Sequence, residues 1–343
     1  MRKNIKVSVL VPIYNRRQFI EQMLECLTAQ TLKEIEFIII DDASTDKTFE
    51  LLQQKTAGDA RFKIMQMAQN SGPSACRNKA LTAVKGKYIG FFDSDDTIPA
   101  DYFASLCQQA EDAGADIVYT AYNEQKHPAG EVSSLEEKLR VLRNGSLWDK
   151  LYKADLIQKN GIKFDEGLYT ADNVFVVKAF YFAQKIVLTN TPVYQYKLHA
   201  DSIGKDKKKT LKRKRDIMTV CSILLDFAKQ KAWTEAQILS LRRFLAKSFD
   251  CYQKDKNFRA ELAKILDLDL KKENLTMNNV EKHSRTVKLF FFLPIYGWKQ
   301  RGGKKSWKIL GLPVFTRRKM SNGITTKYYI LGVPVMKVSK KYV

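Results

Sequence analysis

The sequence is poor in the residues that build disulfide frames and zinc sites. Its 343 residues include only five cysteines, scattered and without a CxxC pair. An odd number of dispersed cysteines indicates free thiols in a reducing compartment. The three histidines are far apart and lack the spacing of metal ligands. A disulfide-rich secreted domain and a zinc ribbon are therefore excluded.

Long hydrophobic runs are also missing. No segment approaches the roughly 20 apolar residues that a spanning helix needs, and the longest candidate, residues 289–298, contains Pro294. The apolar run at residues 7–13 is short, contains Pro12 and is followed by Arg16 and Arg17 without a small-residue cleavage site. This run predicts a first β-strand and not a signal peptide.

The glycine-rich phosphate loops of the common nucleotide-binding folds are absent. No GxGxxG follows the first predicted strand, and no GxxxxGK[ST] occurs anywhere in the chain. The lack of a glycine-rich loop with a lysine also argues against a sugar nucleotidyltransferase.

Acidic residues are scarce in one part of the chain only. Residues 201–343 hold 34 of the 59 basic residues and 12 of the 37 acidic ones, so the whole net charge of +22 lies there. The first 200 residues are balanced. The basic part is predicted to face something anionic.

Strand and helix patterns alternate along the first 120 residues, which predicts an α/β fold with a mostly parallel sheet. Ser44 is expected to cap the second helix, and residues 123–134 are expected to be a polar loop with His127 exposed. The predicted strands are residues 7–13, 37–40, 62–67, 88–92 and 116–119, and the predicted helices include 17–29, 72–84 and 100–113.

Polar side chains gather where the predicted strands end. Asn15 follows the first strand, Asp41 and Asp42 follow the second, and Asp93 and Asp95 follow the strand at 88–92. Ligands of open α/β sheets bind at this edge. Asp93 and Asp95 are spaced to face one ligand, and two hard oxygens suit Mg²⁺ or Mn²⁺ carrying phosphates. The alternative is an acidic turn that caps the next helix.

Four segments, in this order and spacing, resemble the nucleotide-binding half of family 2 glycosyltransferases, which have the GT-A fold. They are VSVLVPIYN (7–15), IIIDDASTDKT (38–48), NSGPSACRNKAL (70–81) and GKYIGFFDSDD (86–96). The resemblance covers about the first 125 residues, and it is specific as an ensemble.

The resemblance implies a site for a nucleoside diphosphate sugar. Asp42 would accept the uracil N–H, with Asp41 as the less favoured partner, and Asp95 would be the better ligand of a Mn²⁺ or Mg²⁺ ion that it shares with Asp93. Tyr14 could instead be a core aromatic, and Arg77 a surface helix residue. The remaining residues that the resemblance places around the nucleotide are Pro12, Tyr14, Asn15, Arg77, Asn78 and Ser94.

A second constellation lies at Trp148–Tyr152 and Phe164–Phe175. It also resembles the family, in which an acidic pair opens a helix. Here that pair is Ala171-Asp172, so the first acid is absent. The resemblance implies that Asp172 is the base that takes the proton of the attacking hydroxyl. A plain helix N-cap is the alternative reading of Asp172.

Residues 193–203 are similar to the YxYxxHxxSI stretch that closes over the donor diphosphate in the family. His199 and Ser202 would then touch phosphate or metal. A structural role for His199 is the alternative.

The composition changes after residue 203. Residues 205–215 carry eight basic side chains, and helical periodicity predicts two or three helices between 208 and 268. A basic run leading into amphipathic helices fits an anionic membrane surface, although charge runs are often only solvated faces. Leu-Gly-x-Pro-Val occurs at 310–314 and again 21 residues later, each copy predicting strand, turn and strand. These repeats could form a small β unit on the membrane or pack on the helices.

These patterns predict an inverting, metal-dependent glycosyltransferase of three parts: a GT-A domain (1–203, with a nucleotide-sugar half at 1–96 and an acceptor half at 97–203), a basic helical region (204–285) and a basic tail (286–343). The donor would be a UDP-hexose or UDP-N-acetylhexosamine. The acceptor would be a lipid-linked saccharide or oligosaccharide of a bacterial surface glycan, at the cytoplasmic face of the membrane. A non-catalytic relative remains an alternative because of Ala171. Nucleic acid is not expected as a partner, because no recognition module accompanies the charge.

Overall fold

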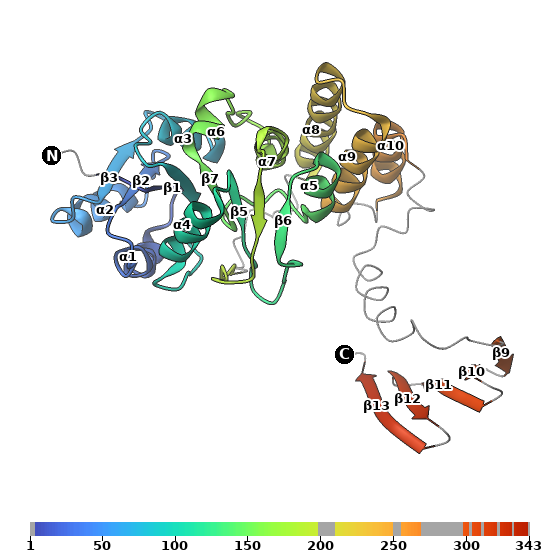
Figure 1. Ribbon diagram of the computed structural model, residues 1–343. Helices are drawn as coiled ribbons and strands as arrows, with labels where there is room; N and C mark the ends of the chain where they lie inside the picture. Colours follow the sequence, from blue (N-terminus) through green and yellow to red (C-terminus); the bar gives the residue numbers. More distant parts are fainter. Residues whose placement is uncertain are drawn as a thin grey trace. The chain divides into compact units, whose positions relative to one another are not determined.

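The computed structural model describes residues 4–197, 210–249 and 255–268, together with five C-terminal strands (Figure 1). The chain divides into two compact units, Met1–Thr276 and Met277–Val343. His199 and Ser202 lie outside the described residues.

The first unit is built on an eight-stranded mixed sheet with the order β3-β2-β1-β4-β7-β5-β8-β6. The first four strands of that order run parallel, and β7 is antiparallel to both β4 and β5. The strands are β1 (Val7–Ile13), β2 (Ile35–Asp41), β3 (Phe62–Gln66), β4 (Tyr88–Phe91), β5 (Ile117–Tyr119), β6 (Gly130–Val132), β7 (Lys150–Lys153) and β8 (Ile186–Leu188). The predicted α/β fold is confirmed; the sheet is parallel from β3 to β4, as expected, and mixed beyond it.

Helices cover both faces of this sheet, because neighbouring residues of a strand point to opposite sides. In β1, Leu10 packs in one core with the helices α3 and α7, whereas Val9 and Val11 pack in the other core with α1 and α4 (Figure 1). The helices of this part are η1 (Arg17–Phe19), α1 (Ile20–Thr28), α2 (Thr48–Thr56), α3 (Pro73–Leu81), α4 (Tyr102–Ala113), α5 (Leu135–Val141), α6 (Ala154–Lys159) and α7 (Ala171–Phe182).

Three local predictions are wrong. The polar loop expected over residues 123–134 contains β6, which pairs antiparallel with β8. Ser44 does not cap α2: the N-cap is Lys47, at φ +66°, and the Ser44 hydroxyl accepts a hydrogen bond from the Asn15 N–H. His127 is 5% exposed, with Nε2 2.9 Å from the Thr120 carbonyl oxygen. Burial, helped by nearby cations, lowers the pKa of His127 to about 4. The His127 N–H also donates to Asn190 Oδ1 at 2.7 Å, a long-range contact that the polar composition around His127 concealed.

Three helices follow in the basic region: α8 (Thr210–Gln230), α9 (Glu235–Ser248) and α10 (Lys256–Leu266). This confirms the helices predicted there. Ile217, Val220 and Leu224 of α8 are buried in the same core as α7, so α8 is an integral part of the first unit. None of the helices in the described part of the chain has the length and apolar character that a membrane crossing requires.

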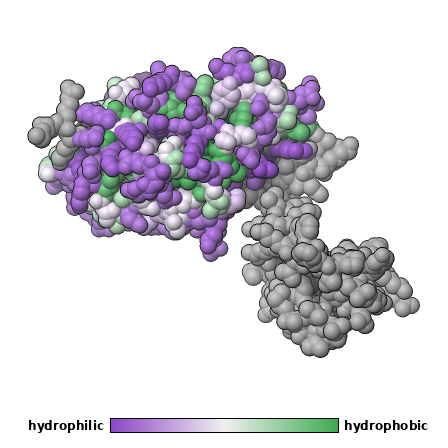
Figure 2. Space-filling view, viewed as in Figure 1, coloured by the Kyte–Doolittle hydropathy of each residue, from purple (hydrophilic) through white to green (hydrophobic). Residues whose placement is uncertain are grey.

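Hydrophilic residues cover most of the face shown in Figure 2, and hydrophobic ones form small patches between them. Much of the apolar content of the described first unit is buried in the two cores on either side of the sheet.

The second unit is an antiparallel sheet with the order β13-β12-β11-β10-β9. Its two repeat hairpins share one register: Ile309 pairs with Leu312 in the first, and Ile330 pairs with Val333 in the second. The strands predicted on both sides of each Leu-Gly are therefore confirmed. The strands are β9 (Trp298–Arg301), β10 (Lys304–Ile309), β11 (Leu312–Met320), β12 (Gly323–Ile330) and β13 (Val333–Lys341).

Candidate active site

The loops after β1 and β2 are tied together at the carboxyl edge of the sheet. Asn15 is at φ +50°, a left-handed conformation that Asn tolerates better than most residues. Its Oδ1 accepts a hydrogen bond of 2.9 Å from the Thr45 N–H, and its own N–H donates to Ser44 Oγ at 2.9 Å. Asn15 therefore orders the edge where a ligand of an α/β sheet binds.

The two aspartates after β2 are both buried but differ in their partners. Asp42 accepts hydrogen bonds of 2.8 Å from the backbone N–H groups of Ser71 and Gly72, one on each oxygen. Asp41 Oδ1 accepts from Gln66 Nε2 at 3.0 Å, and Asp41 Oδ2 is buried without a hydrogen-bond partner. A carboxylate offers about four lone-pair sites, so each aspartate retains acceptor capacity.

Tyr14 is 44% exposed, which rules out the alternative that it is a core aromatic. Pro12, which pairs in register with Ile40 of β2, is partly buried just before it. Tyr14 thus presents an accessible ring next to the ordered loop of Asn15.

Arg77 brings the two predicted halves of the site together. Its side chain is only 9% exposed, so the alternative of a surface helix residue is wrong. Nη1 donates to Asp172 Oδ1 at 3.0 Å, and Nη2 lies 3.5 Å from Asp93 Oδ1. The guanidinium also lies over the ring of Phe164, 5.6 Å from its centroid.

Asn78 is engaged with the loop that precedes α7. Its Nδ2 donates to the Phe164 carbonyl oxygen and to Glu166 Oε1, both at 2.9 Å, and its Oδ1 accepts from the Phe164 N–H at 2.9 Å. The structure thus gives Asn78 a part in holding the loop that leads to Asp172.

The acidic segment after β4 concentrates negative charge at the site. Burial raises the pKa of Asp93 to about 6; Arg77 opposes this rise, and Asp172 and Asp95 add to it. Ser94 is buried between Asp93 and Asp95. The sequence predicted this cluster of acids at the end of β4.

Asp96 and Tyr194 form a contact that the sequence analysis did not assign. Tyr194 Oη donates to Asp96 Oδ2 at 2.8 Å and accepts from the Asp93 N–H at 3.3 Å. Asp96 is fully buried, and burial raises its pKa to about 7. The ring of Trp148 stacks on Tyr194, with centroids 4.4 Å apart. In the sequence, the tyrosines at 194 and 196 were the pattern that could have indicated an aromatic contact with Asp96.

Asp172 lies in the first turn of α7, but it is not the N-cap. The cap is Thr170, which makes no side-chain cap hydrogen bond. The plain N-cap reading of Asp172 is therefore wrong. Burial raises the pKa of the Asp172 carboxyl, and Arg77 opposes that rise. A carboxyl with a raised pKa is suited to accept a proton.

The residues present fit a divalent cation that phosphates help to bind. Asp93 and Asp95 offer hard oxygen ligands of the kind that Mg²⁺ and Mn²⁺ prefer, and Asp172 is close enough to Asp93 to raise its pKa. No cluster of three or more His, Cys, Asp or Glu that could hold a metal occurs among the described residues. Two carboxylates would therefore need ligands from the substrate or from water, as Mg²⁺ sites commonly do.

Comparison with known proteins points to one family. Residues 8–160 match the family model of glycosyl transferase family 2. The Bacillus subtilis protein EpsH is 31% identical over 223 residues, which are 60% of this chain and 64% of EpsH. Poly(ribitol-phosphate) beta-N-acetylglucosaminyltransferase TarS of Staphylococcus aureus is 29% identical over 203 residues, which are 56% of this chain and 35% of TarS.

Solved structures agree with this match. The crystal structure of S. aureus TarS 1–349 in complex with UDP-GlcNAc has a TM-score of 0.62 and 25% identity, covering 80% of this chain and 79% of that chain. Residues 8–160 therefore match glycosyl transferase family 2, and the first unit has the GT-A fold. The chain spans less than two thirds of the length of its relatives EpsH and EpsJ, and about a third of GlyA of Streptococcus pneumoniae.

Proposed function

We propose that this chain is an inverting glycosyltransferase that moves a sugar from a UDP-sugar to a hydroxyl of a bacterial surface glycan precursor. The observation that carries the proposal is the bridge made by Arg77, which holds Asp93 of the predicted diphosphate site and Asp172 on one guanidinium. Donor and acceptor chemistry require carboxylates on both sides of the sugar that is transferred.

The donor side is assigned from the sheet edge. Tyr14, Pro12 and Asn15 would border the base and ribose, and Asp42, with Asp41 beside it, would accept the uracil N–H. TarS, the relative crystallised with UDP-GlcNAc, supports a UDP-sugar such as a UDP-hexose or UDP-N-acetylhexosamine. His199 and Ser202 stay predictions for the diphosphate side.

Asp93 and Asp95 would hold Mn²⁺ or Mg²⁺. When bound, such an ion neutralises the negative charge that grows on the departing diphosphate.

The acceptor side depends on Asp172. Its carboxylate takes the proton of the acceptor hydroxyl while the hydroxyl oxygen bonds to the anomeric carbon. The bond from that carbon to the UDP oxygen breaks in the same displacement, and UDP leaves with the electron pair. Arg77 opposes the rise in the pKa of Asp172, and its hydrogen bond to Oδ1 fixes the position of the carboxylate.

The test is UDP release from a panel of nucleotide sugars, with and without an acceptor glycan, in Mn²⁺ or Mg²⁺ and then in EDTA. We expect one UDP-sugar to be turned over and EDTA to abolish the reaction. Metal-dependent UDP binding without turnover under any condition would support the non-catalytic alternative that Ala171 raises. No binding of UDP would contradict the proposal.

We also propose that the basic region contacts an anionic membrane surface, which would place the enzyme at the cytoplasmic face. The excess of basic residues after residue 200 supports this, as does Leu211, which is 71% exposed at the start of α8. Flotation with phosphatidylglycerol vesicles tests it. We expect binding that weakens as salt rises, and equal binding to neutral vesicles would contradict it.

A further inference from the structure

The first turns of α8 contact the loop that leads to Asp172. Lys212 Nζ donates to the Gly167 carbonyl oxygen at 2.7 Å. Asp216, one turn later, accepts from the Tyr169 N–H at 3.1 Å. Lys212 and Asp216 also pair with each other at 2.9 Å, so the two contacts support one another.

A third side chain of α8 reaches the same loop. Arg213 is 3% exposed, and its guanidinium lies over the ring of Tyr169 at 4.6 Å from the centroid. Asp216 is 8% exposed. Hydrogen bonds in such partly dehydrated places are stronger than those on an open surface. Tyr169 precedes Asp172 by three residues and lies directly before Thr170, the N-cap of α7, so this contact is close to the proposed base.

The other end of the loop is fixed by the donor half. Asn78 holds Phe164 and Glu166 through three hydrogen bonds of 2.9 Å. The loop is therefore clamped between α3 and α8. The N-terminal half of α8 is itself held in place, because Ile217 and Val220 are buried in the core shared with α7.

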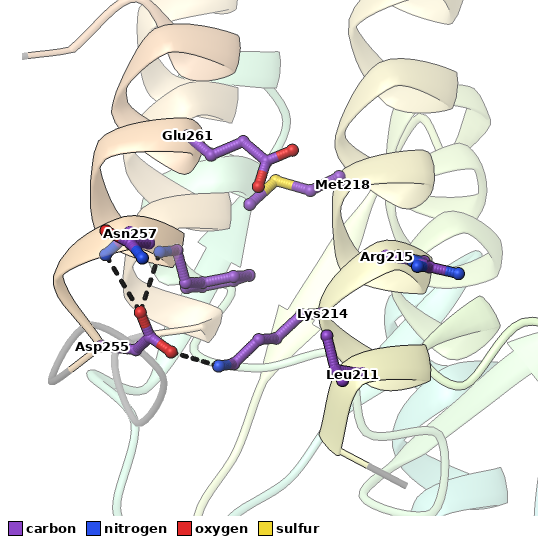
Figure 3. Close-up of a pocket in the computed structure, with 8 residues that line it drawn as sticks. Leu211, Lys214, Arg215, Met218, Asp255, Asn257 and Glu261 are labelled. Atoms are coloured by element: carbon purple, nitrogen blue, oxygen red, sulfur yellow. Dashed lines mark hydrogen bonds and ion pairs between the residues drawn. The ribbon is translucent and has the colours of Figure 1, made fainter.

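The basic run of α8 is thus largely committed to contacts within the chain. Lys212 and Arg213 contact the loop, and Lys214 pairs with Asp255 at the start of α10 (Figure 3). A run that was only a solvated face would not make these contacts.

We infer that Lys212, Arg213 and Asp216 are positioning residues for Asp172. They touch no reacting atom, but they fix the loop before α7 and thereby the position of the Asp172 carboxylate relative to Arg77. This inference rests on the proposed role of Asp172 as the base. It makes the helical region part of the catalytic apparatus, in addition to any role at a surface.

The test compares Asp216→Ala with Asp216→Asn, which keeps an acceptor for the Tyr169 N–H. Lys212→Met is a second variant, at a side chain 65% exposed and therefore compatible with folding. Asp226→Ala is the matched control, since Asp226 lies on the same helix, is 64% exposed and, among the residues that the structure describes, forms an ion pair with Lys229 alone, at 3.6 Å.

Two readouts are measured on the full chain. The first is hydrogen exchange of residues 165–171, which needs no activity; we expect faster exchange in Asp216→Ala and Lys212→Met, and wild-type exchange in the control. The second is the kinetic split. We expect kcat to fall on the order of tenfold, as misplaced catalytic groups generally show, with the KM for the UDP-sugar and the Kd for UDP unchanged and partial rescue in Asp216→Asn.

Unchanged exchange and unchanged kcat in both variants would overturn the inference. A parallel loss of kcat, UDP affinity and Tm would overturn it too, because that pattern indicates general unfolding. Failure of the proposed function can be told apart from failure of this inference. If the wild type is inactive, hydrogen exchange still shows whether Lys212 and Asp216 hold the loop at residues 165–171.

Discussion

Arg77 Nη1 lies 3.0 Å from Asp172 Oδ1, although 95 residues separate the two in sequence. The same guanidinium also contacts Asp93, which follows the end of β4. One cation therefore connects the end of β4 with the first turn of α7, and its removal affects both carboxylates.

Replacing Arg77 by Met should destabilise the protein. The change leaves Asp93 and Asp172 with like charge and no cation between them, and loss of one partner of a buried pair is costly. Because both carboxylates are about one-third exposed, we expect the free energy of unfolding to fall by about 2 kcal/mol. Urea denaturation at pH 7 measures this.

The control is Arg140→Met. Arg140 is 76% exposed and pairs with Glu137 at 3.9 Å. Its loss should change the free energy of unfolding by less than about 0.5 kcal/mol. Equal losses in the free energy of unfolding from the two replacements would show that the Arg77 bridge stabilises the protein no more than an exposed ion pair does.

Asp93 should make stability depend on pH in the absence of ligand. Its pKa rises from 3.8 to about 6 in the folded protein, so the native state holds the proton more tightly than the unfolded chain does. This stabilising contribution is complete below pH 4 and is lost as the pH rises through about 6.

Asp93→Asn should therefore match the wild type near pH 4 and exceed it at pH 7 by about 1 kcal/mol, after allowing for partial exposure. Thermal unfolding across this range is the measurement. A variant that is less stable than the wild type at pH 7 would contradict the raised pKa. With Mn²⁺ and UDP present, the wild type should become more stable than Asp93→Asn, because only the wild type keeps both predicted metal ligands.

Asp42 should matter for the loop that opens α3 as well as for the nucleotide. Asp42→Ala removes the acceptors of the Ser71 and Gly72 N–H groups, and we expect a loss of about 2 kcal/mol in the free energy of unfolding. Asp42→Asn keeps one acceptor and should lose about half as much. Both variants should bind UDP more weakly by calorimetry; wild-type affinity in both would exclude Asp42 from the base pocket.

The sequence predicted the framework of the fold because its signals are local. Apolar runs identify β1, β2 and β4, and the polar residues at their ends, Asn15 after β1 and aspartates at β2 and β4, mark the edge of the sheet. Asp41, Asp42, Asp93 and Asp95 could be singled out in this way, whereas Asp172 was singled out by the resemblance to family 2 glycosyltransferases. The error at Ser44 arose because a residue suited to an N-cap was instead used by Asn15, an interaction across 29 residues.

The supports of the site could not be predicted, because they join residues far apart in sequence. Asn78 meets Phe164 across 86 residues, and Tyr194 meets Asp96 across 98. No periodicity encodes such pairs. The buried side of the basic run at Arg213 was hidden for the same reason, since charge composition does not show which cation an aromatic ring will cover.

The most direct test of the account separates binding from chemistry in two variants. Asp95→Asn and Asp172→Asn are compared with wild type and with Asp101→Asn, an exposed aspartate whose side chain makes no cap hydrogen bond. UDP affinity in Mn²⁺ is measured by calorimetry, and sugar transfer is measured on the donor found in the panel. We predict that Asp95→Asn loses metal-dependent UDP binding, whereas Asp172→Asn binds UDP like the wild type and loses transfer. Transfer at the wild-type rate by Asp172→Asn would contradict the central claim.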